Sequence, residues 1–128
     1  KCSVIAIEEV PQNQTNRYGI IAGNLIDNDS IYRVTDMIEK PEPQDAPSNL
    51  AIIGRYILTP DIFQILRDIK PGKDGEYQIT DALLTQAMNG KVIAYKFQGR
   101  RFDCGSIEGY LEATNYFAKQ QGIISREK

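Results

Sequence analysis

Histidine is absent from this chain of 128 residues. Without an imidazole, the chain cannot build a Ser-His-Asp or Cys-His nucleophile system, a histidine-based zinc site or a histidine general base. The chemistry that remains uses carboxylate, lysine and arginine groups. These groups suit phosphates, sugars and a hard divalent cation, because such reactions depend mainly on positioning and charge neutralisation.

Cysteine is also scarce, with two residues in the whole chain. Cys2 and Cys104 are enough for one bridge, but their spacing matches neither a CxxC motif nor a zinc pattern. Disulfide scaffolds carry cysteine at a much higher density. We therefore expect both residues to be reduced thiols.

Long apolar runs and clusters of basic residues are missing as well. No stretch approaches the ~20 residues that span a bilayer, and no segment has the order of a signal peptide. The 15 basic residues are scattered and the net charge is −2, so neither a membrane nor a nucleic acid is an expected partner. We expect a soluble protein of the cytoplasm.

The length of the chain allows one domain at most and is small for a complete nucleotide-using enzyme. The first residue is Lys1, and an apolar run follows it directly, without a capping or leader segment. We therefore expect the chain to be a piece of a longer protein.

Apolar patterning and turn residues predict strands mixed with helices. Three strands arrive before any helix, so we expect a three-layer α/β fold with a mixed sheet and a β-rich excursion, not a regular βαβ repeat. The second and third strands are expected to form a hairpin. The predicted strands cover residues 3–10, 18–26, 31–38, 48–58 with an interruption at Gly54, and 91–97.

Three helices are predicted from capping signals and helical spacing. The first is expected to have Thr59 as its N-cap and Pro60 at its first helical position. The second is expected to be capped by Thr80 or its neighbour and to end before Asn89-Gly90. The third is expected over about 107–120, with Ser106 as its cap.

The segment Ile38-Glu39-Lys40-Pro41 is the strongest candidate for a binding site. Pro41 is expected to hold Lys40 in an extended conformation, so that Glu39 and Lys40 stand at the carboxyl end of a strand, where open α/β sheets bind ligands. A carboxylate there accepts hydrogen bonds from a sugar diol, and an ammonium neutralises a phosphate. Neighbouring strand residues point to opposite faces, so a shared ligand requires a bend in the backbone. The alternative is an edge strand ending in solvated charges.

Asp103 stands in a short segment that turns through Gly105 into the last predicted helix. One interpretation is a ligand for Mg²⁺, a hard cation that prefers oxygen donors. The other is a cap or an Asx-turn. One carboxylate does not make a metal site, so a second would have to come from elsewhere.

Two glycines invite two interpretations each. Gly19, which follows Tyr18, either relieves a turn or offers a backbone N–H to a sugar hydroxyl where a side chain would block access. Gly54 marks either a bulge or a close approach of a ligand within its strand.

Taken together, these segments resemble the second half of bacterial UTP:glucose-1-phosphate uridylyltransferases. The likeness covers nearly the whole chain, and its most specific parts are the sequence motifs APSNLA, GRY and DCGS. The matching segments are YGI at 18–20, IEKP at 38–41, APSNLAIIGRYIL at 46–58, GEYQITDA at 75–82 and FDCGS at 102–106.

The resemblance implies part of a three-layer, Rossmann-like nucleotide-diphospho-sugar transferase fold. It also implies an enzyme that uses Mg²⁺ to make UDP-glucose and pyrophosphate from UTP and glucose 1-phosphate. By analogy with the family, Glu39 would hold sugar hydroxyls, Lys40 the sugar phosphate, Gly19 and Gly54 further sugar contacts, and Asp103 the metal. Lys40 and Asp103 would carry the catalytic burden.

The resemblance also sets limits. Residues 1–128 would form the sugar-phosphate and metal portion of a nucleotidyltransferase domain, because the family's glycine-rich nucleotide loop and first metal-binding Asp lie upstream. We therefore expect no activity from this chain alone, and a homodimer or homotetramer for the intact enzyme. Ile107 stands where the family usually has Lys, so a non-catalytic regulatory paralogue is the alternative.

Overall fold

The computed structural model describes residues 1–27, 29–72 and 75–124. The chain forms two compact units, Lys1–Phe97 and Gln98–Lys128. The elements of the first unit are β1 (Ser3–Glu9), the 3₁₀ helix η1 (Gln12–Arg17), β2 (Gly19–Asp27), β3 (Ile31–Glu39), β4 (Leu50–Ile57), α1 (Ile62–Asp68), α2 (Ile79–Met88) and β5 (Val92–Lys96); the second unit contains α3 (Ile107–Gln120).

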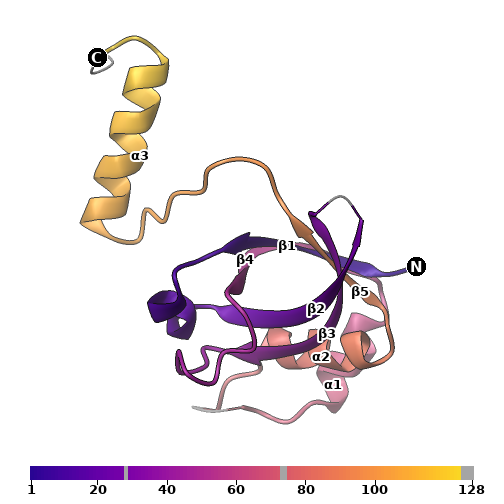
Figure 1. Cartoon of the computed structure of the whole chain (residues 1–128). Helices are drawn as coiled ribbons and strands as arrows, with labels where there is room; N and C mark the ends of the chain where they lie inside the picture. Colours follow the sequence, from indigo (N-terminus) through magenta and orange to yellow (C-terminus); the bar gives the residue numbers. More distant parts are fainter. Residues whose placement is uncertain (28, 73–74, 125–128) are drawn as a thin grey trace. The chain divides into compact units, whose positions relative to one another are not determined.

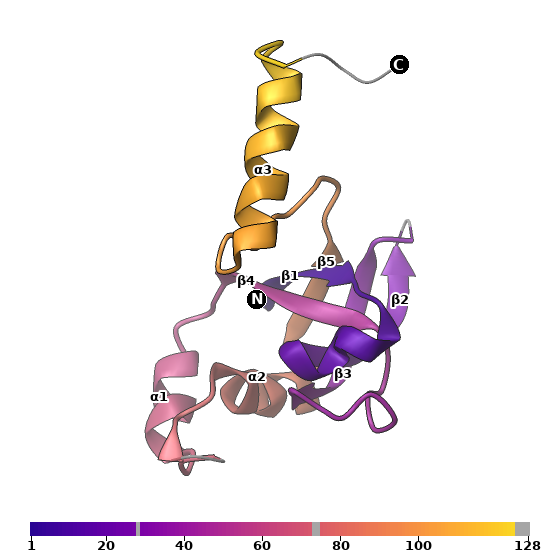
Figure 2. The same ribbon diagram turned by 90° about the vertical axis from the view of Figure 1, so that its left-hand side faces the viewer.

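The five strands of the first unit form one sheet that closes on itself in the order β1-β4-β2-β3-β5. β1 pairs with β5 in parallel, and the other neighbours are antiparallel. Helices α1 and α2 lie together on one side of this sheet (Figures 1 and 2). The predictions of a mixed sheet and of a β2–β3 hairpin are therefore confirmed.

The core of the first unit lies between the closed sheet and α2. Ile5 and Ile7 alternate with half-buried residues along β1, so one face of the strand supplies buried isoleucines. Burying each such side chain stabilises the fold by roughly 1.5–3 kcal/mol. Helix α2 adds Ala82, Leu83 and Ala87, a stripe at helical spacing that packs into the same cluster.

Thr59 does not cap the first helix, contrary to the sequence prediction. The helix begins at Ile62, its N-cap position is Asp61, and no side chain caps it. Thr59 instead joins a polar network, because its hydroxyl accepts a hydrogen bond from Gln86 Nε2 at 3.0 Å and its N–H donates to Ser3 Oγ at 3.1 Å. Tertiary partners from β1 and α2 thus replace the local cap.

Thr80 does not cap the second helix either. The N-cap position of α2 is Gln78, and Thr80 lies within the first turn, where its side chain is buried. The predicted end of the helix is confirmed, since Asn89 is the C-cap and Gly90 follows with φ of 68°. That left-handed conformation suits glycine.

The second unit is dominated by α3, whose predicted bounds are confirmed. The Ser106 hydroxyl caps it by accepting a hydrogen bond from the Gly109 N–H at 3.1 Å. Phe102, Tyr116 and Phe117 form an aromatic cluster, with the Arg100 guanidinium over two of the rings. Within the described part of the chain, no helix combines the length and the apolar character needed to cross a membrane.

Candidate functional site

Gly19 and Glu39 are direct partners across the β2–β3 hairpin. Gly19 is buried, and a Cβ atom placed on it would lie 2.9 Å from Glu39 Oε2 and 3.2 Å from Ile52 Cδ1. No ordinary side chain fits at this distance without a shift of its neighbours. The missing side chain of Gly19 therefore makes room for the Glu39 carboxylate.

Lys40 is not extended, contrary to the sequence prediction. Its φ is 46°, one of two positive values among the described non-glycine residues. Its N–H donates a hydrogen bond to the Tyr18 carbonyl at 3.0 Å, and the following Pro41 is buried. These tertiary contacts hold the backbone in a left-handed conformation that an L residue rarely adopts.

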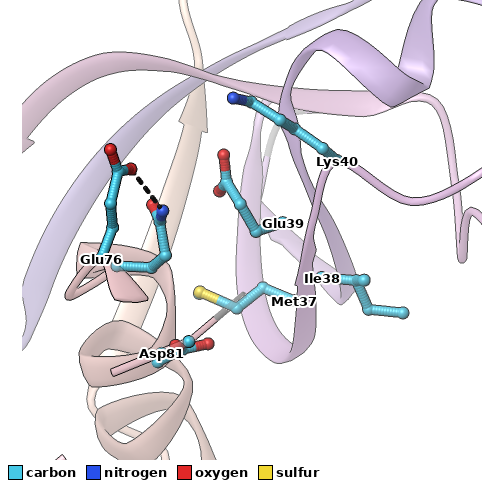
Figure 3. A pocket seen from close by; sticks show the side chains of 8 residues that line it. Met37, Ile38, Glu39, Lys40, Glu76 and Asp81 are labelled. Carbon is cyan, nitrogen blue, oxygen red and sulfur yellow. Dashed lines mark hydrogen bonds between the residues drawn. The ribbon is translucent and has the colours of Figure 1, made fainter. Parts of the chain in front are cut away.

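This reversal brings the side chains of Glu39 and Lys40 to one side of the strand end. Figure 3 shows the two charged groups directed into the same space, whereas Ile38 points away from it. The bend that a shared ligand requires is therefore present. Strand alternation alone would have sent Glu39 and Lys40 to opposite faces.

Two adjoining pockets meet at Glu39 and Gln78. The larger measures about 460 Å³ and the smaller about 240 Å³, and small-molecule sites in proteins span about 300–1,000 Å³. The larger pocket is lined by Met37, Ile38, Glu39, Lys40, Gly72, Glu76, Gln78 and Asp81 (Figure 3), and the smaller by Arg17, Tyr18, Gly19, Glu39, Ile52, Gly54, Tyr56, Gln78, Ile79 and Thr80.

The hydrogen bonds of the pocket leave acceptor and donor groups available. Thr80 Oγ1 donates to Glu39 Oε2 at 2.5 Å, and among the described residues Oε1 accepts no hydrogen bond. The Lys40 ammonium likewise forms no ion pair with any residue in the described ranges. Burial, together with the negative charge of Glu39, raises the pKa of the Tyr56 hydroxyl at the wall of the smaller pocket.

Gly54 lies in a bulge of β4. Ile5 and Ile7 are two residues apart on β1, but their partners Tyr56 and Ile52 are four apart on β4, so the register shifts at this point. Gly54 has φ of 73°, and a Cβ there would meet no atom within 4 Å. The bulge interpretation is therefore confirmed, and the open space beside Gly54 belongs to the smaller pocket.

Asp103 lies in the second unit, in the loop before α3. Its Oδ1 accepts a hydrogen bond from the Gly105 N–H at 3.0 Å, which is an Asx-turn. The backbone of Asp103 also packs closely against the first turn of α3, since a Cβ on Gly109 would lie 1.9 Å from the Asp103 carbonyl oxygen. The carboxylate is exposed, and Oδ2 accepts no hydrogen bond from the described residues.

Asp103 supplies one oxygen donor of the kind that Mg²⁺ prefers. A magnesium ion is usually held by one or two carboxylates together with substrate phosphates and water, and Asp103 Oδ2 is one such oxygen donor. Within the described residues, no cluster of three His, Cys, Asp or Glu side chains is arranged to hold a metal. The remaining ligands of such a site would therefore have to come from substrate, water or other protein segments.

Residues 1–120 match the family model described as nucleotidyl transferase. The chain belongs to the nucleotidyl transferase family. Enzymes of this family generally use Mg²⁺. The nucleotidyltransferase fold expected from the motifs is therefore confirmed.

The nucleotidyl transferase chain is similar to curated and structurally characterised uridylyltransferases. It is 65% identical over 116 residues to UTP–glucose-1-phosphate uridylyltransferase of Pseudomonas aeruginosa strain PAO1, and the match covers 91% of this chain and 41% of that protein. The chain thus spans about two-fifths of the length of this relative. The resemblance stated from the sequence motifs is confirmed.

Two solved structures are similar to the chain in both fold and sequence. UDP-glucose pyrophosphorylase complexed with UDP-glucose has a TM-score of 0.87 and 57% identity over 93% of this chain and 45% of its own. A UTP-bound enzyme of the same kind from Acinetobacter baumannii has a TM-score of 0.77 and 36% identity over 93% of this chain and 40% of its own.

In this nucleotidyl transferase, four of the residues that line the pockets were predicted as site residues from the sequence, and Thr80 and Tyr56 are among those that were not. Gly19, Glu39, Lys40 and Gly54 line the adjoining pockets, whereas Asp103 belongs to the other unit. Thr80 was expected only as a helix cap, and Tyr56 was not singled out. The GRY and ITD segments that contain them were recognised, but the pairing of Thr80 with Glu39 has no local signal, because 41 residues separate them.

Proposed function

We propose that this chain forms the sugar-phosphate portion of an enzyme that transfers a uridylyl group from UTP to glucose 1-phosphate, giving UDP-glucose and pyrophosphate. The observation that carries the proposal is the bent strand end, where an acceptor carboxylate and an ammonium that has no ion-pair partner among the described residues face one pocket. The 65% identity to a uridylyltransferase supports the choice of substrates.

Each pocket residue takes a role that its chemistry allows. Glu39 Oε1 accepts hydrogen bonds from sugar hydroxyls, and the Lys40 ammonium neutralises the sugar phosphate. Gly19 and Gly54 contribute backbone contacts on the sugar side; the absence of a side chain leaves open space at Gly54 and room for the Glu39 carboxylate at Gly19.

The reaction needs no general base. An oxygen of the glucose 1-phosphate dianion forms a bond to the α-phosphorus of UTP, and the bond from that phosphorus to the bridging oxygen breaks, so that pyrophosphate leaves. The attacking oxygen is already anionic near neutral pH, which agrees with a chain without histidine. The main barrier is the approach of two anions, and Lys40 lowers it by reducing their repulsion.

Asp103 would hold Mg²⁺ through Oδ2, the oxygen outside its Asx-turn. Bound there, the metal would supply charge neutralisation for the phosphates. The Asx-turn and the close packing against Gly109 keep the Asp103 backbone in one arrangement.

The nucleotide-binding portion is proposed to lie outside residues 1–128, because the chain spans only 41% of its uridylyltransferase relative. The chain would then be inactive alone and active as part of a cytoplasmic homodimer or homotetramer. A non-catalytic regulatory paralogue is the second candidate. It is favoured by Ile107, the exposed first residue of α3, at a position where the resembled family usually has Lys.

The test is pyrophosphate release by the full-length protein that carries this chain, with Mg²⁺, glucose 1-phosphate and each nucleoside triphosphate in turn. Release with UTP that is lost in Asp103→Ala is the expected result. If the protein releases pyrophosphate with none of the nucleoside triphosphates, the proposal is overturned in favour of the regulatory paralogue. Full activity in Asp103→Ala would show that Asp103 does not hold the metal, without contradicting the proposed uridylyl transfer.

The role of Lys40 has a separate test. Lys40→Ala in the full-length protein is expected to raise the KM for glucose 1-phosphate far more than the KM for UTP. Equal increases would show that Lys40 does not bind the sugar phosphate.

A further inference from the structure

We infer that Thr80 is a positioning residue that orients the Glu39 carboxylate and thereby sets the preference of the pocket for a hydroxylated sugar phosphate. The inference rests on the proposed function and deepens it. Thr80 does not itself contact the sugar in this scheme, and it acts only through Glu39.

The contact between the two side chains is short and partly buried at the wall of the smaller pocket. Thr80 Oγ1 donates to Glu39 Oε2 at 2.5 Å, and the Thr80 side chain is buried in the first turn of α2. A hydroxyl bound to a carboxylate gives a charge-assisted hydrogen bond, which is stronger than a bond between neutral groups. The hydroxyl therefore holds one particular carboxylate oxygen.

Gly19 borders the same oxygen, next to the Thr80 hydroxyl. An added Cβ on Gly19 would lie 2.9 Å from Glu39 Oε2 and 3.4 Å from Thr80 Oγ1, so these three groups pack into one small space. Helix α2 has 10 residues, and its first turn lies beside this space, where the positive end of the helix dipole favours a carboxylate. Glu39 Oε2 is thus held by contacts within the protein.

The consequence is that Oε1 is the oxygen left for the ligand. A carboxylate anchored at one oxygen loses little side-chain freedom when the other accepts a hydrogen bond from a sugar, because the ordering has already occurred. Burial raises the pKa of the Tyr56 phenol, which also lines the smaller pocket, and the negative charge of Glu39 raises it further. An unanchored Glu39 would bind the sugar hydroxyls more weakly and with less discrimination.

The experiment compares Thr80→Val, Thr80→Ser and Thr85→Val in the full-length protein with Mg²⁺ and UTP. Valine keeps the shape of threonine without the donor, and serine keeps the donor. Thr85 is the matched control, since it is exposed on the same helix and its hydroxyl donates only to the Asp81 backbone carbonyl. Thermal unfolding of each variant establishes that it is folded.

Thr80→Val is expected to raise the KM for glucose 1-phosphate at least tenfold, with the KM for UTP changed less than twofold. Thr80→Ser is expected to restore most of the loss, and Thr85→Val to leave both constants unchanged. The 2-deoxy and 3-deoxy analogues of glucose 1-phosphate each lack one sugar hydroxyl. For the analogue that lacks the hydroxyl bound by Glu39, the preference of the enzyme for glucose 1-phosphate over that analogue should be smaller in Thr80→Val than in wild type. Equal increases in both KM values, or a change below twofold, would overturn the inference.

A double-mutant cycle separates positioning from a general structural effect. In a Glu39→Ala background, Thr80→Val is expected to change the KM for glucose 1-phosphate less than twofold, because the group it positions is gone. If Thr80→Val raises this KM by the same factor in the Glu39→Ala background as in wild type, Thr80 acts independently of Glu39.

Calorimetric titration with glucose 1-phosphate distinguishes failure of the inference from failure of the proposed function. If the wild-type protein binds the sugar phosphate but releases no pyrophosphate, the proposed activity is overturned. The inference about Thr80 is then supported if Thr80→Val binds glucose 1-phosphate more weakly than wild type, and overturned if it binds equally well. Wild-type protein that binds no glucose 1-phosphate overturns both.

Discussion

At the scale of single residues, the pocket depends on the space that Gly19 leaves for the Glu39 carboxylate. The clash that a Cβ would cause involves a carboxylate oxygen and the Cδ1 atom of Ile52, and both belong to packed side chains. A substitution here therefore moves a group that is proposed to bind sugar, even though Gly19 itself has no side chain.

Gly19→Ala is expected to raise the KM for glucose 1-phosphate in the full-length protein roughly tenfold or more, since a charge-assisted hydrogen bond is worth about 1.5–3 kcal/mol and 1.4 kcal/mol is about a factor of ten. Gly90→Ala is the control. Its φ of 68° makes alanine strained, but it lies after α2 and outside both pockets, so it should cost about 1 kcal/mol of stability with no change in KM. An unchanged KM in Gly19→Ala would refute the role of this space.

The left-handed backbone of Lys40 is expected to lower the stability of the fold, while the Lys40 ammonium is proposed to strengthen the binding of glucose 1-phosphate. Lys40→Gly removes the ammonium and the strain of φ 46°, whereas Lys40→Ala removes the ammonium but keeps the Cβ and therefore the strain. In urea unfolding of the full-length protein, the glycine variant is expected to be more stable than the alanine variant by about 1 kcal/mol. Both should lose affinity for glucose 1-phosphate equally, and equal stabilities would show that the backbone there is not strained.

At the scale of elements, a polar network joins the start of β1, the loop before α1 and the middle of α2. Ser3 Oγ donates to Gln86 Oε1 at 2.7 Å, and Gln86 Nε2 donates to Thr59 Oγ1 at 3.0 Å and to Asp61 Oδ1 at 3.1 Å. Hydrogen bonds from Thr59 and Gln86 lower the pKa of Asp61 below its usual value of 3.8. The network thus favours the ionised form of Asp61.

This lowered pKa predicts a pH-dependent stability. Stability contributed by a carboxylate with a lowered folded pKa is present above its unfolded value and is lost as pH falls through that value toward the folded pKa. Urea unfolding between about pH 5 and pH 3 should therefore show a smaller loss for Asp61→Asn than for wild type. Asp68→Asn, an exposed carboxylate outside the network, should follow wild type, and parallel curves for wild type and Asp61→Asn would contradict the prediction.

At the scale of the whole molecule, the sheet is closed by strands from opposite ends of the first unit. Ser3 pairs with Val92 and Val4 with Ile93, so β1 and β5 meet across most of the unit's sequence. The Glu39–Lys40 strand end, the Gly54 bulge and the first turn of α2 come to one pair of pockets because β2 pairs with both β3 and β4 and α2 packs against β3. The proposed division of labour places the nucleotide site outside this chain.

The isolated chain is therefore expected to release no pyrophosphate from UTP and glucose 1-phosphate with Mg²⁺, whereas the full-length protein does. A circular dichroism spectrum with strand and helix signals, recorded on the same sample, serves as the control for folding. Turnover by the folded isolated chain would contradict the proposed division.

The sequence by itself determined the elements and singled out four of the residues that line the pockets. Strands and helices followed apolar patterning, the Ser106 cap and the Asn89-Gly90 end, all of which act within a few residues, and the motifs around Glu39, Lys40 and Gly54 marked the site. The tertiary structure alone decided how these residues are used. Lys40 turns because its N–H donates a hydrogen bond to the Tyr18 carbonyl, and Thr80 binds Glu39 because α2 packs against β3 in the core. Both contacts join distant segments, and long-range hydrogen bonds of this kind override local conformational preference without leaving a pattern in the sequence.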